Sequence, residues 1–338
     1  MNTVTALNKK YIPYTGTMLV SHGINENEHI DAYLLHSELE QRDISFIEEA
    51  VKDYDITIHP IFVDKNIFSD RLPHNDQWSL ETYYRLLMLE LLPDTVDRAL
   101  YLDGDMVINK SLQDLYYLDF EEATIIACDD ACGLNFPEKY GPKHNEMFRV
   151  AYEYGYRYFN AGVMLLNISK MRELYSFQTY LDAINVWNYQ MEAPDQDILN
   201  WVHWKEVAYV DCMVYDLFAR VAHNAEITYE EVKENVAIIH FAGEKPWNND
   251  NVHFDIERLW WDYARKTPFY EDLLVRFVET AMSDKTVEQY RNGLVNQRNE
   301  LKNSLDSIMA RIKIITGAGG TECTRNSHTG GQIFITEM

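Results

Sequence analysis

The stretch Ala99–Phe120, ALYLDGDMVINKSLQDLYYLDF, decides what kind of fold the chain can form. It begins as an apolar run typical of a buried strand and turns polar at Asp103-Gly104-Asp105. Two carboxylates this close repel each other, so they need either a cation or a solvated turn. Gly104 lets the backbone turn tightly, which allows both carboxylates to converge. The stretch therefore predicts a strand that ends in an acidic pair.

The residues before this stretch alternate short apolar runs with helical patterns. The expected strands are Asn2–Leu7, Ile30–Leu35, Ile56–Phe62 and Arg98–Leu102. The expected helices are Tyr14–His22, Glu38–Lys52 and a third that has Ser79 as its N-cap and stops at Pro93. Strands separated by helices predict βαβ crossovers and an α/β fold with a mostly parallel sheet. Ligands of such sheets bind at the carboxyl ends of the strands, which is where Asp103 and Asp105 lie.

The pattern is less regular after residue 120. Later strands are expected at Thr124–Asp130, Tyr158–Asn167 and Val236–Gly243. The polar, tyrosine-rich segment Phe136–Tyr156 is interpreted as an excursion from the sheet and a candidate lid.

Composition excludes several classes of protein. The 338 residues are 46% apolar and carry a formal net charge of −24, which disfavours a nucleic-acid partner. No apolar run approaches the roughly 20 residues of a membrane span, and the N-terminal sequence lacks a signal-peptide pattern. The four cysteines have no zinc-binding spacing. We expect a cytoplasmic enzyme with reduced thiols.

The C-terminal region has a different pattern. Apolar residues recur every seven positions, at Val287, Leu294, Leu301, Ile308 and Ile315. The other core position of this heptad holds Arg291 and Arg298 before it becomes apolar. Only one of the two core positions is therefore apolar throughout. The helix could pack on the domain before it, associate with a second copy, or bind the inner face of a membrane. We expect a catalytic domain at 1–275, a helical segment at 276–315 and a glycine-rich disordered tail at 316–338.

Three D-x-D sequences occur, and alone each is weak evidence. Asp53-Tyr54-Asp55 lies at a helix-to-strand junction and is interpreted as a solvated turn. Asp103-Gly104-Asp105 offers two hard oxygen ligands suited to Mg²⁺ or Mn²⁺. In Asp195-Gln196-Asp197, Asp195 is expected to cap a helix, leaving Gln196 or Asp197 facing a cleft.

A histidine from the last expected strand completes a metal-binding pattern. His240 ends the apolar run in IIHFAGEKPWN, so its imidazole should emerge at the same side of the sheet as the acidic pair. Two carboxylates and an imidazole favour Mn²⁺ over Mg²⁺. Gly243 permits close approach of the backbone, and Lys245 offers a cation for a phosphate.

Four segments in this order, YLDGD, YFNAGVMLLN, DQDILN and HFAGEKPW, resemble glycosyltransferase family 8. The resemblance covers roughly residues 2–270. That family includes retaining galactosyl- and glucosyltransferases of bacterial cell-surface glycans, and the glycogenins. The resemblance implies a GT-A nucleotide-diphospho-sugar transferase fold that uses Mn²⁺. It also implies transfer of glucose or galactose from a UDP-sugar to a glycan, lipid-linked or protein acceptor.

The resemblance also implies roles for individual residues. Asp103, Asp105 and His240 match the metal ligands, and Lys245 matches the lysine that meets the donor diphosphate. Asn160 and Gly162 match the sugar pocket, Arg85 and Asp130 match positions that hold the donor sugar, and Tyr11 is expected to stack on uracil. The full set of expected donor-binding residues is Ala6, Asn8, Tyr11, Arg85, Asp103, Gly104, Asp130, Asn160, Gly162, Gly243 and Lys245.

Two features depart from the family pattern. Asn8 stands where the first loop often has an acidic residue, and the spacing H-x-x-G-x-K-P-W is one residue shorter than the commonest form. The first departure bears on base selectivity and the second on the reach of Lys245.

The expected catalytic residues are Gln196, Asp195 and Asp197. Gln196 matches the side chain nearest the anomeric carbon, and Asp195 matches an acceptor or sugar contact. An amide is a poor nucleophile, so same-face attack is favoured, with a donor phosphate oxygen taking the acceptor proton and Gln196 stabilising positive charge on the sugar. Asp197 is the fallback nucleophile.

Two alternatives stay open at this point. A phosphatase of the haloacid dehalogenase type also places aspartates after a parallel strand, but Met106 and Val107 stand where its motif has glycine and threonine. A catalytically idle protein that binds nucleotide-sugar or glycan is the other.

Overall fold

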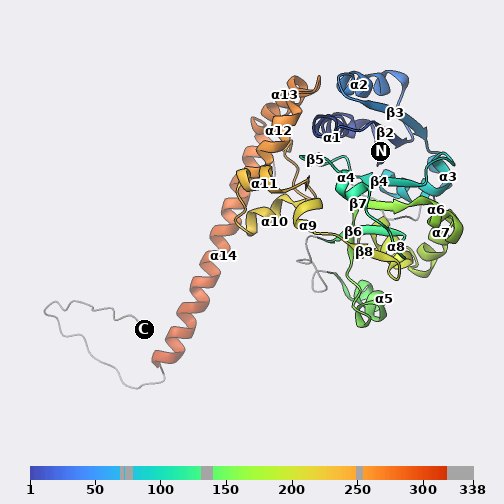
Figure 1. Ribbon diagram of the computed structural model, residues 1–338. Coiled ribbons are helices and arrows are strands. Elements are labelled where there is room, and N and C mark those ends of the chain that lie inside the picture. Colours follow the sequence, from blue (N-terminus) through green and yellow to red (C-terminus); the bar gives the residue numbers. More distant parts are fainter. Residues whose placement is uncertain (69–71, 73–78, 131–139, 249–253, 318–338) are drawn as a thin grey trace, which may run out of the picture. The chain divides into compact units, whose positions relative to one another are not determined.

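The computed structural model describes residues 1–68, 72, 79–130, 140–248 and 254–317 (Figure 1). The chain divides by its internal contacts into a unit at residues 1–280 and a second at residues 281–338. The first unit contains both sheets and the candidate site. In the second, Asp284–Gly317 form the helix α14.

The main sheet has seven strands in the order β3-β2-β1-β4-β7-β6-β8. Within it β1, β2, β3 and β4 run parallel, β7 runs antiparallel to both β4 and β6, and β8 is parallel to β6. The strand bounds are β1 (Asn2–Ala6), β2 (Ile30–His36), β3 (Ile56–Phe62), β4 (Arg98–Leu102), β6 (Ile125–Asp129), β7 (Phe159–Asn167) and β8 (Val207–Tyr209). The expected α/β fold with a mostly parallel sheet is confirmed.

The two faces of this sheet contribute to separate hydrophobic cores because successive side chains of a strand point to opposite sides. In β4, Leu100 and Leu102 pack in the core that includes α1 and α2 residues such as Met18 and Ile47. Ala99 and Tyr101 of the same strand pack in the core formed with η3 and α5–α8. Both faces of the sheet are therefore covered by helices, as the continuous apolar runs of these strands require.

A three-stranded sheet, in the order β5-β10-β9, follows directly from the turn after β4. Its strands are β5 (Met106–Ile108), β9 (Leu217–Phe218) and β10 (Ile238–His240). β10 pairs antiparallel with β5 and parallel with β9. A third hydrophobic core beside this sheet includes Val107, Ile239 and Trp260.

The helices of the first unit connect these strands and cover the sheets (Figure 1). The 3₁₀ helices are η1 (Lys9–Tyr11), η2 (Lys65–Ile67), η3 (Leu80–Leu87) and η5 (Asp255–Glu257). The α-helices are α1 (Ile12–Asn25), α2 (Gln41–Val51), α3 (Met88–Leu91), α4 (Gln113–Tyr116), α5 (Pro142–Glu153), α6 (Ile168–Leu174), α7 (Phe177–Val186), α8 (Pro194–His203), α9 (Cys212–Tyr215), α10 (Ala219–Asn224), α11 (Tyr229–Asn235), α12 (Arg258–Ala264) and α13 (Tyr270–Ala281).

The expected helix after Ser79 forms, but most of it is the 3₁₀ helix η3, and only Met88–Leu91 is α-helical. Ser79 occupies the N-cap position without a side-chain cap bond. Apolar spacing does not separate the two helix types, because both place a buried residue about every third position. The short strands β5, β8 and β9 were not predicted, since two or three residues are too few to show a period.

The polar segment Phe136–Tyr156 is not simply a loop. Residues Pro142–Glu153 form α5, whose Phe148 is fully buried. Residues 136–139 lie outside the described part of the chain. The lid interpretation stays a prediction.

The boundary expected after residue 275 falls inside α13, whereas the contacts divide the chain after Thr280. The C-terminal helix is present and contains the seven-residue repeat, but its role stays a prediction. The expected tail begins in the last turn of α14 and lies outside the described residues from 318 onward. Among the described helices, none combines the length and apolarity needed to cross a membrane.

A buried histidine predicts how the stability of the first unit depends on pH. The two ring nitrogens of His203 in α8 are hydrogen-bonded to the hydroxyls of Thr124 and Tyr180. Burial lowers the pKa of His203 to about 3. Between pH 7 and pH 5 only the unfolded chain protonates it, so this residue reduces the free energy of unfolding by about 2 kcal/mol. Urea denaturation measures the free energy of unfolding at the two pH values. From pH 7 to pH 5 this free energy should fall by about 2 kcal/mol less in His203→Gln than in the wild type. Equal losses in the two proteins would contradict this.

Candidate active site

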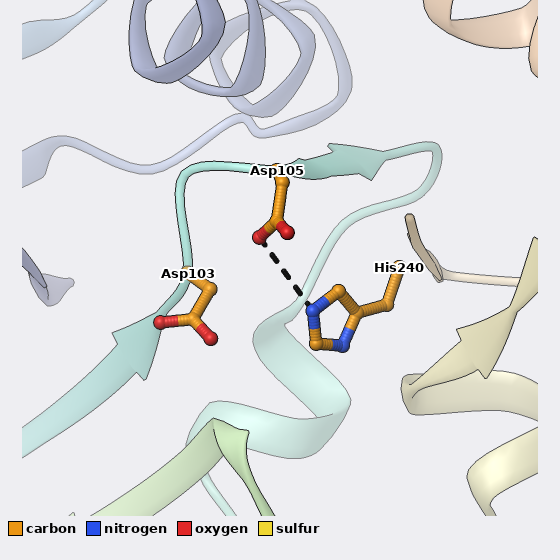
Figure 2. Close-up of side chains that lie close together, drawn as sticks. All are labelled: Asp103, Asp105 and His240. Carbon is orange, nitrogen blue, oxygen red and sulfur yellow. Dashed lines mark ion pairs between the residues drawn. The ribbon is translucent and has the colours of Figure 1, made fainter. Parts of the chain in front are cut away.

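Two carboxylates and one imidazole converge at the junction of the two sheets (Figure 2). Asp103 follows β4, Asp105 ends the tight turn before β5, and His240 is the last residue of β10. Each offers one ligand atom, and these atoms lie within 4.8 Å of one another. The structure therefore brings together the three residues that the sequence analysis expected to hold a metal.

Backbone register explains how a residue distant in sequence reaches the acidic pair. In the β5–β10 ladder His240 lies opposite Met106, next to Asp105. The amide of Phe241 donates to the carbonyl of Asp105 at 3.0 Å. His240 Nε2 then lies 3.5 Å from Asp105 Oδ1, the contact marked in Figure 2.

Gly162 leaves the space that this group needs. This position has no room for a side chain, because a Cβ there would lie 2.6 Å from His240 Cε1 and 2.9 Å from Asp103 Oδ2. The carbonyl of Gly162 accepts from the amide of Asp103 at 2.9 Å, which fixes the two strands at this point. Gly104 is similarly restricted, since a Cβ would lie 2.5 Å from Thr15 Oγ1.

Basic groups compensate the charge of Asp105. Lys245 Nζ contacts its carboxylate directly and also donates to the carbonyl of Phe241 at 2.9 Å. Burial alone would raise the pKa of Asp105, but Lys245 and His240 outweigh it and lower the pKa. Burial also disfavours the charged form of His240, yet Asp216 and Asp105 raise its pKa to about 10. Lys245 thus lies beside the acidic pair despite the short spacing from His240.

Arg85 connects the candidate metal ligands to helix α8. Its side chain is buried, with Nη2 at 2.8 Å from Asp103 Oδ1 and Nε at 3.0 Å from Asp195 Oδ2. The guanidinium also lies over the Tyr101 ring at 4.3 Å. Burial raises the pKa of Asp195 to about 6, although Arg85 acts against this. The expected capping role of Asp195 is wrong, because Ala193 is the N-cap of α8 and no side chain caps it.

A hydrogen-bonded network next to Arg85 joins four residues expected in the sugar pocket. Asn160 Nδ2 donates to Asp130 Oδ1 at 2.9 Å and to Gln196 Oε1 at 3.2 Å, while its Oδ1 accepts from the Gly162 amide at 2.8 Å. Gln196 Oε1 also accepts from the Ala161 amide at 2.9 Å. The amide of Gln196 is therefore held beside β7 and is only partly buried.

Asp197 is placed quite differently from Gln196. It is fully buried, and Oδ1 accepts from the Tyr158 hydroxyl at 2.7 Å and lies 3.0 Å from His144 Nδ1. Its Oδ2 accepts from the amides of Glu192 and Ala193. Both oxygens are thus engaged in holding the start of α8, and Asp197 does not face a cleft.

The first loop has its own internal partners. Asn8 Oδ1 accepts from the amides of Lys10 and Tyr11 and caps η1, and Ala6 ends β1 next to this loop. The Tyr11 ring contacts the Tyr14 and Trp247 rings edge-on at 5.4 and 6.5 Å. Tyr14 and Trp247 are stacked at 3.8 Å. An aromatic cluster therefore stands beside Gly104, although stacking of Tyr11 on a base stays a prediction.

Gly243 adopts φ +93°, a conformation that favours glycine, and a Cβ there would lie 3.0 Å from Arg220 Nη1. This turn redirects the chain after β10 toward Lys245.

The sequence analysis missed Asp216, Tyr101, Tyr14 and Trp247, all of which contact expected site residues. Trp247 lies inside the quoted KPWN segment and could have been included. Asp216 follows the short helix α9 and precedes a two-residue strand, so no spacing in the sequence singled it out.

Gly162→Ala tests whether the close approach at this glycine supports a metal site. We expect the variant to fold but to bind Mn²⁺ about tenfold or more weakly, because the new Cβ displaces His240 or Asp103. Isothermal titration calorimetry measures the affinity. Gly293→Ala is the matched control, since no atom lies within 4 Å of its Cβ. Equal affinity in both variants would count against the geometry described above.

Comparisons with known proteins show the family and the fold of this chain. The family model described as Glycosyl transferase family 8 matches residues 2–251. A lipopolysaccharide 1,2-glucosyltransferase of Escherichia coli is 25% identical, covering 69% of this chain and 74% of that protein. A lipopolysaccharide 1,3-galactosyltransferase of Salmonella typhimurium is 26% identical, covering 65% of this chain and 64% of that protein.

Among solved structures, that of the galactosyltransferase LgtC in complex with donor and acceptor sugar analogs superposes with a TM-score of 0.68. It is 24% identical and covers 79% of this chain and 96% of that one. The expected GT-A fold is thereby confirmed. The family match goes against the phosphatase alternative. With a family model spanning most of its first unit, the chain belongs to glycosyltransferase family 8.

Proposed function

We propose that this protein transfers glucose or galactose from a UDP-sugar to a glycan or lipid-linked acceptor, with retention of the anomeric configuration. The observation that supports this most directly is the convergence of Asp103, Asp105 and His240 beside the Asn160–Gln196 network. The family and the two lipopolysaccharide relatives favour a hexose as the group transferred.

The three candidate ligands fit a divalent cation, since Asp103 and Asp105 supply hard oxygens and His240 supplies a nitrogen. The imidazole favours Mn²⁺ over Mg²⁺. When bound there, the cation acts as a Lewis acid that offsets negative charge building on the leaving diphosphate.

Two cations of the protein have different roles at the donor site. Lys245 Nζ contacts the Asp105 carboxylate, and it is the cation that we assign to a phosphate oxygen of the donor. Arg85 is fixed by Asp103, Asp195 and the Ala161 carbonyl, so it orients the carboxylates of the donor pocket instead of swinging freely. Asp195 and Asp130 are the carboxylates that we assign to the sugar hydroxyls. Asp195 is held by Arg85, and Asp130 accepts from Asn160 and from the Tyr140 hydroxyl.

Gln196 is the side chain that we assign to the reacting carbon. Its Oε1 accepts from two donors on β7, so the orientation of its amide is fixed beside Asn160. Asp197 is withdrawn from the role of fallback nucleophile, because both of its oxygens are engaged and it is fully buried. Because Asp197 is engaged through both oxygens, we propose same-face attack assisted by a donor phosphate oxygen.

Asp103→Asn and Asp105→Asn test the metal assignment. Each should reduce Mn²⁺-dependent hydrolysis of UDP-glucose and UDP-galactose by about hundredfold or more, since a metal ligand contributes several kcal/mol to the transition state. UDP release is the readout, and circular dichroism checks folding. Asp53→Asn, in the exposed D-x-D at the α2–β3 junction, is the matched control and should keep full activity. Full activity in either site variant would reject the assignment.

Lys245→Met separates diphosphate binding from metal binding. Loss of a charged hydrogen bond should raise the KM for the UDP-sugar about 10- to 100-fold. Mn²⁺ affinity without donor should hold or increase, because the ammonium no longer competes at Asp105. Lys52→Met removes an exposed lysine paired with Glu49 and serves as the control. An unchanged KM would remove Lys245 from the donor site.

The idle-binding alternative makes a distinct prediction. Calorimetry would then show UDP-sugar binding by the wild-type chain with no hydrolysis or transfer in the presence of Mn²⁺. Turnover of either UDP-sugar rejects it.

A further inference from the structure

We propose that Asp216 is a positioning residue that fixes the ring orientation of His240 and thereby the affinity of the metal site. This inference rests on the proposed function, because it requires that Asp103, Asp105 and His240 bind a divalent cation.

Asp216 is held against His240 by the second sheet. It immediately precedes β9, and in the β9–β10 ladder Phe218 lies opposite His240. Asp216 Oδ1 lies 2.8 Å from His240 Nδ1, with the Asp216 side chain fully buried. The Phe218 ring meets the imidazole edge-on at 4.9 Å, so a carboxylate and an aromatic ring both restrict it.

This contact determines which nitrogen is presented to the acidic pair. A carboxylate accepts a hydrogen bond from Nδ1–H, so Nδ1 is the nitrogen that keeps its proton and Nε2 is the one that can give up its proton and serve as a ligand. Nε2 is also the nitrogen that lies 3.5 Å from Asp105 Oδ1. The two ring nitrogens therefore have separate partners on opposite sides of the ring.

The second oxygen of Asp216 indicates that the carboxylate is not there for packing. Asp216 Oδ2 is buried and has no hydrogen-bond partner among the described residues. A buried acceptor without a partner costs free energy, and an apolar side chain of similar size would avoid that cost. Hydrogen bonding from a carboxylate to a ligating histidine offsets it by making Nε2 more basic and fixing its direction.

The test measures Mn²⁺ affinity of the full chain by isothermal titration calorimetry at pH 7.5. Asp216→Asn keeps an acceptor for Nδ1–H but loses the charge, and Asp216→Ala loses both. We expect affinity to fall in the order wild type, Asp216→Asn, Asp216→Ala, with a total loss of about 10- to 100-fold. Asp55→Asn is the matched control, because it removes the charge from a second aspartate–histidine pair, to His29 Nδ1 at 2.7 Å, which is exposed and includes none of the expected metal ligands. Its affinity should equal that of the wild type.

A second measurement uses the wild-type chain, so it does not depend on a variant that folds. In the ¹⁵N spectrum of the Zn²⁺-loaded protein, His240 should show a protonated Nδ1 and a metal-bound Nε2. The opposite tautomer overturns the inference, as does equal Mn²⁺ affinity in folded Asp216→Ala. If the wild type itself binds no divalent cation, the proposed metal site fails instead, and the two failures are thereby distinguished.

Discussion

The site depends on holding Asp103 and Asp105 close together in a largely buried position. Like charges at this distance destabilise the folded state unless positive charge lies nearby. The structure provides it asymmetrically, with Arg85 on Asp103 and with Lys245 and His240 on Asp105. Strand pairing and the glycines at the site place these partners or leave room for them.

Strand pairing does most of this placement. The turn after β4 carries the chain from the seven-stranded sheet into the three-stranded sheet, so Asp105 lies where the two sheets meet. Pairing of β5 with β10 then fixes His240 beside it, and pairing of β10 with β9 brings Asp216 behind the imidazole. Gly162 of the antiparallel strand β7 completes the arrangement by having no side chain. A backbone ladder tolerates little displacement, which gives the three ligands a defined geometry.

The two D-x-D segments near the site differ in their physical role. In Asp103-Gly104-Asp105 the carboxylates converge on one another, because glycine permits the turn. In Asp195-Gln196-Asp197 the helix separates them, so that Asp195 pairs with Arg85 and Asp197 is buried against Tyr158 and His144. Only Gln196, between them, is directed to the network on β7. This division supports an enzyme that stabilises charge at this position without supplying a nucleophile.

The sequence by itself determined the α/β class, the positions of the long strands and the grouping of Asp103, Asp105 and His240. These follow from local patterns, since apolar runs of five or more residues and polar residues at their ends can be recognised without tertiary contacts. Tertiary structure alone decided the 3₁₀ form of η3, the short strands β5 and β9, the burial of Asp197 and the pairing of Asp216 with His240. Each of these depends on which distant segment packs alongside, and two- or three-residue elements are stabilised by their neighbours and not by their own sequence.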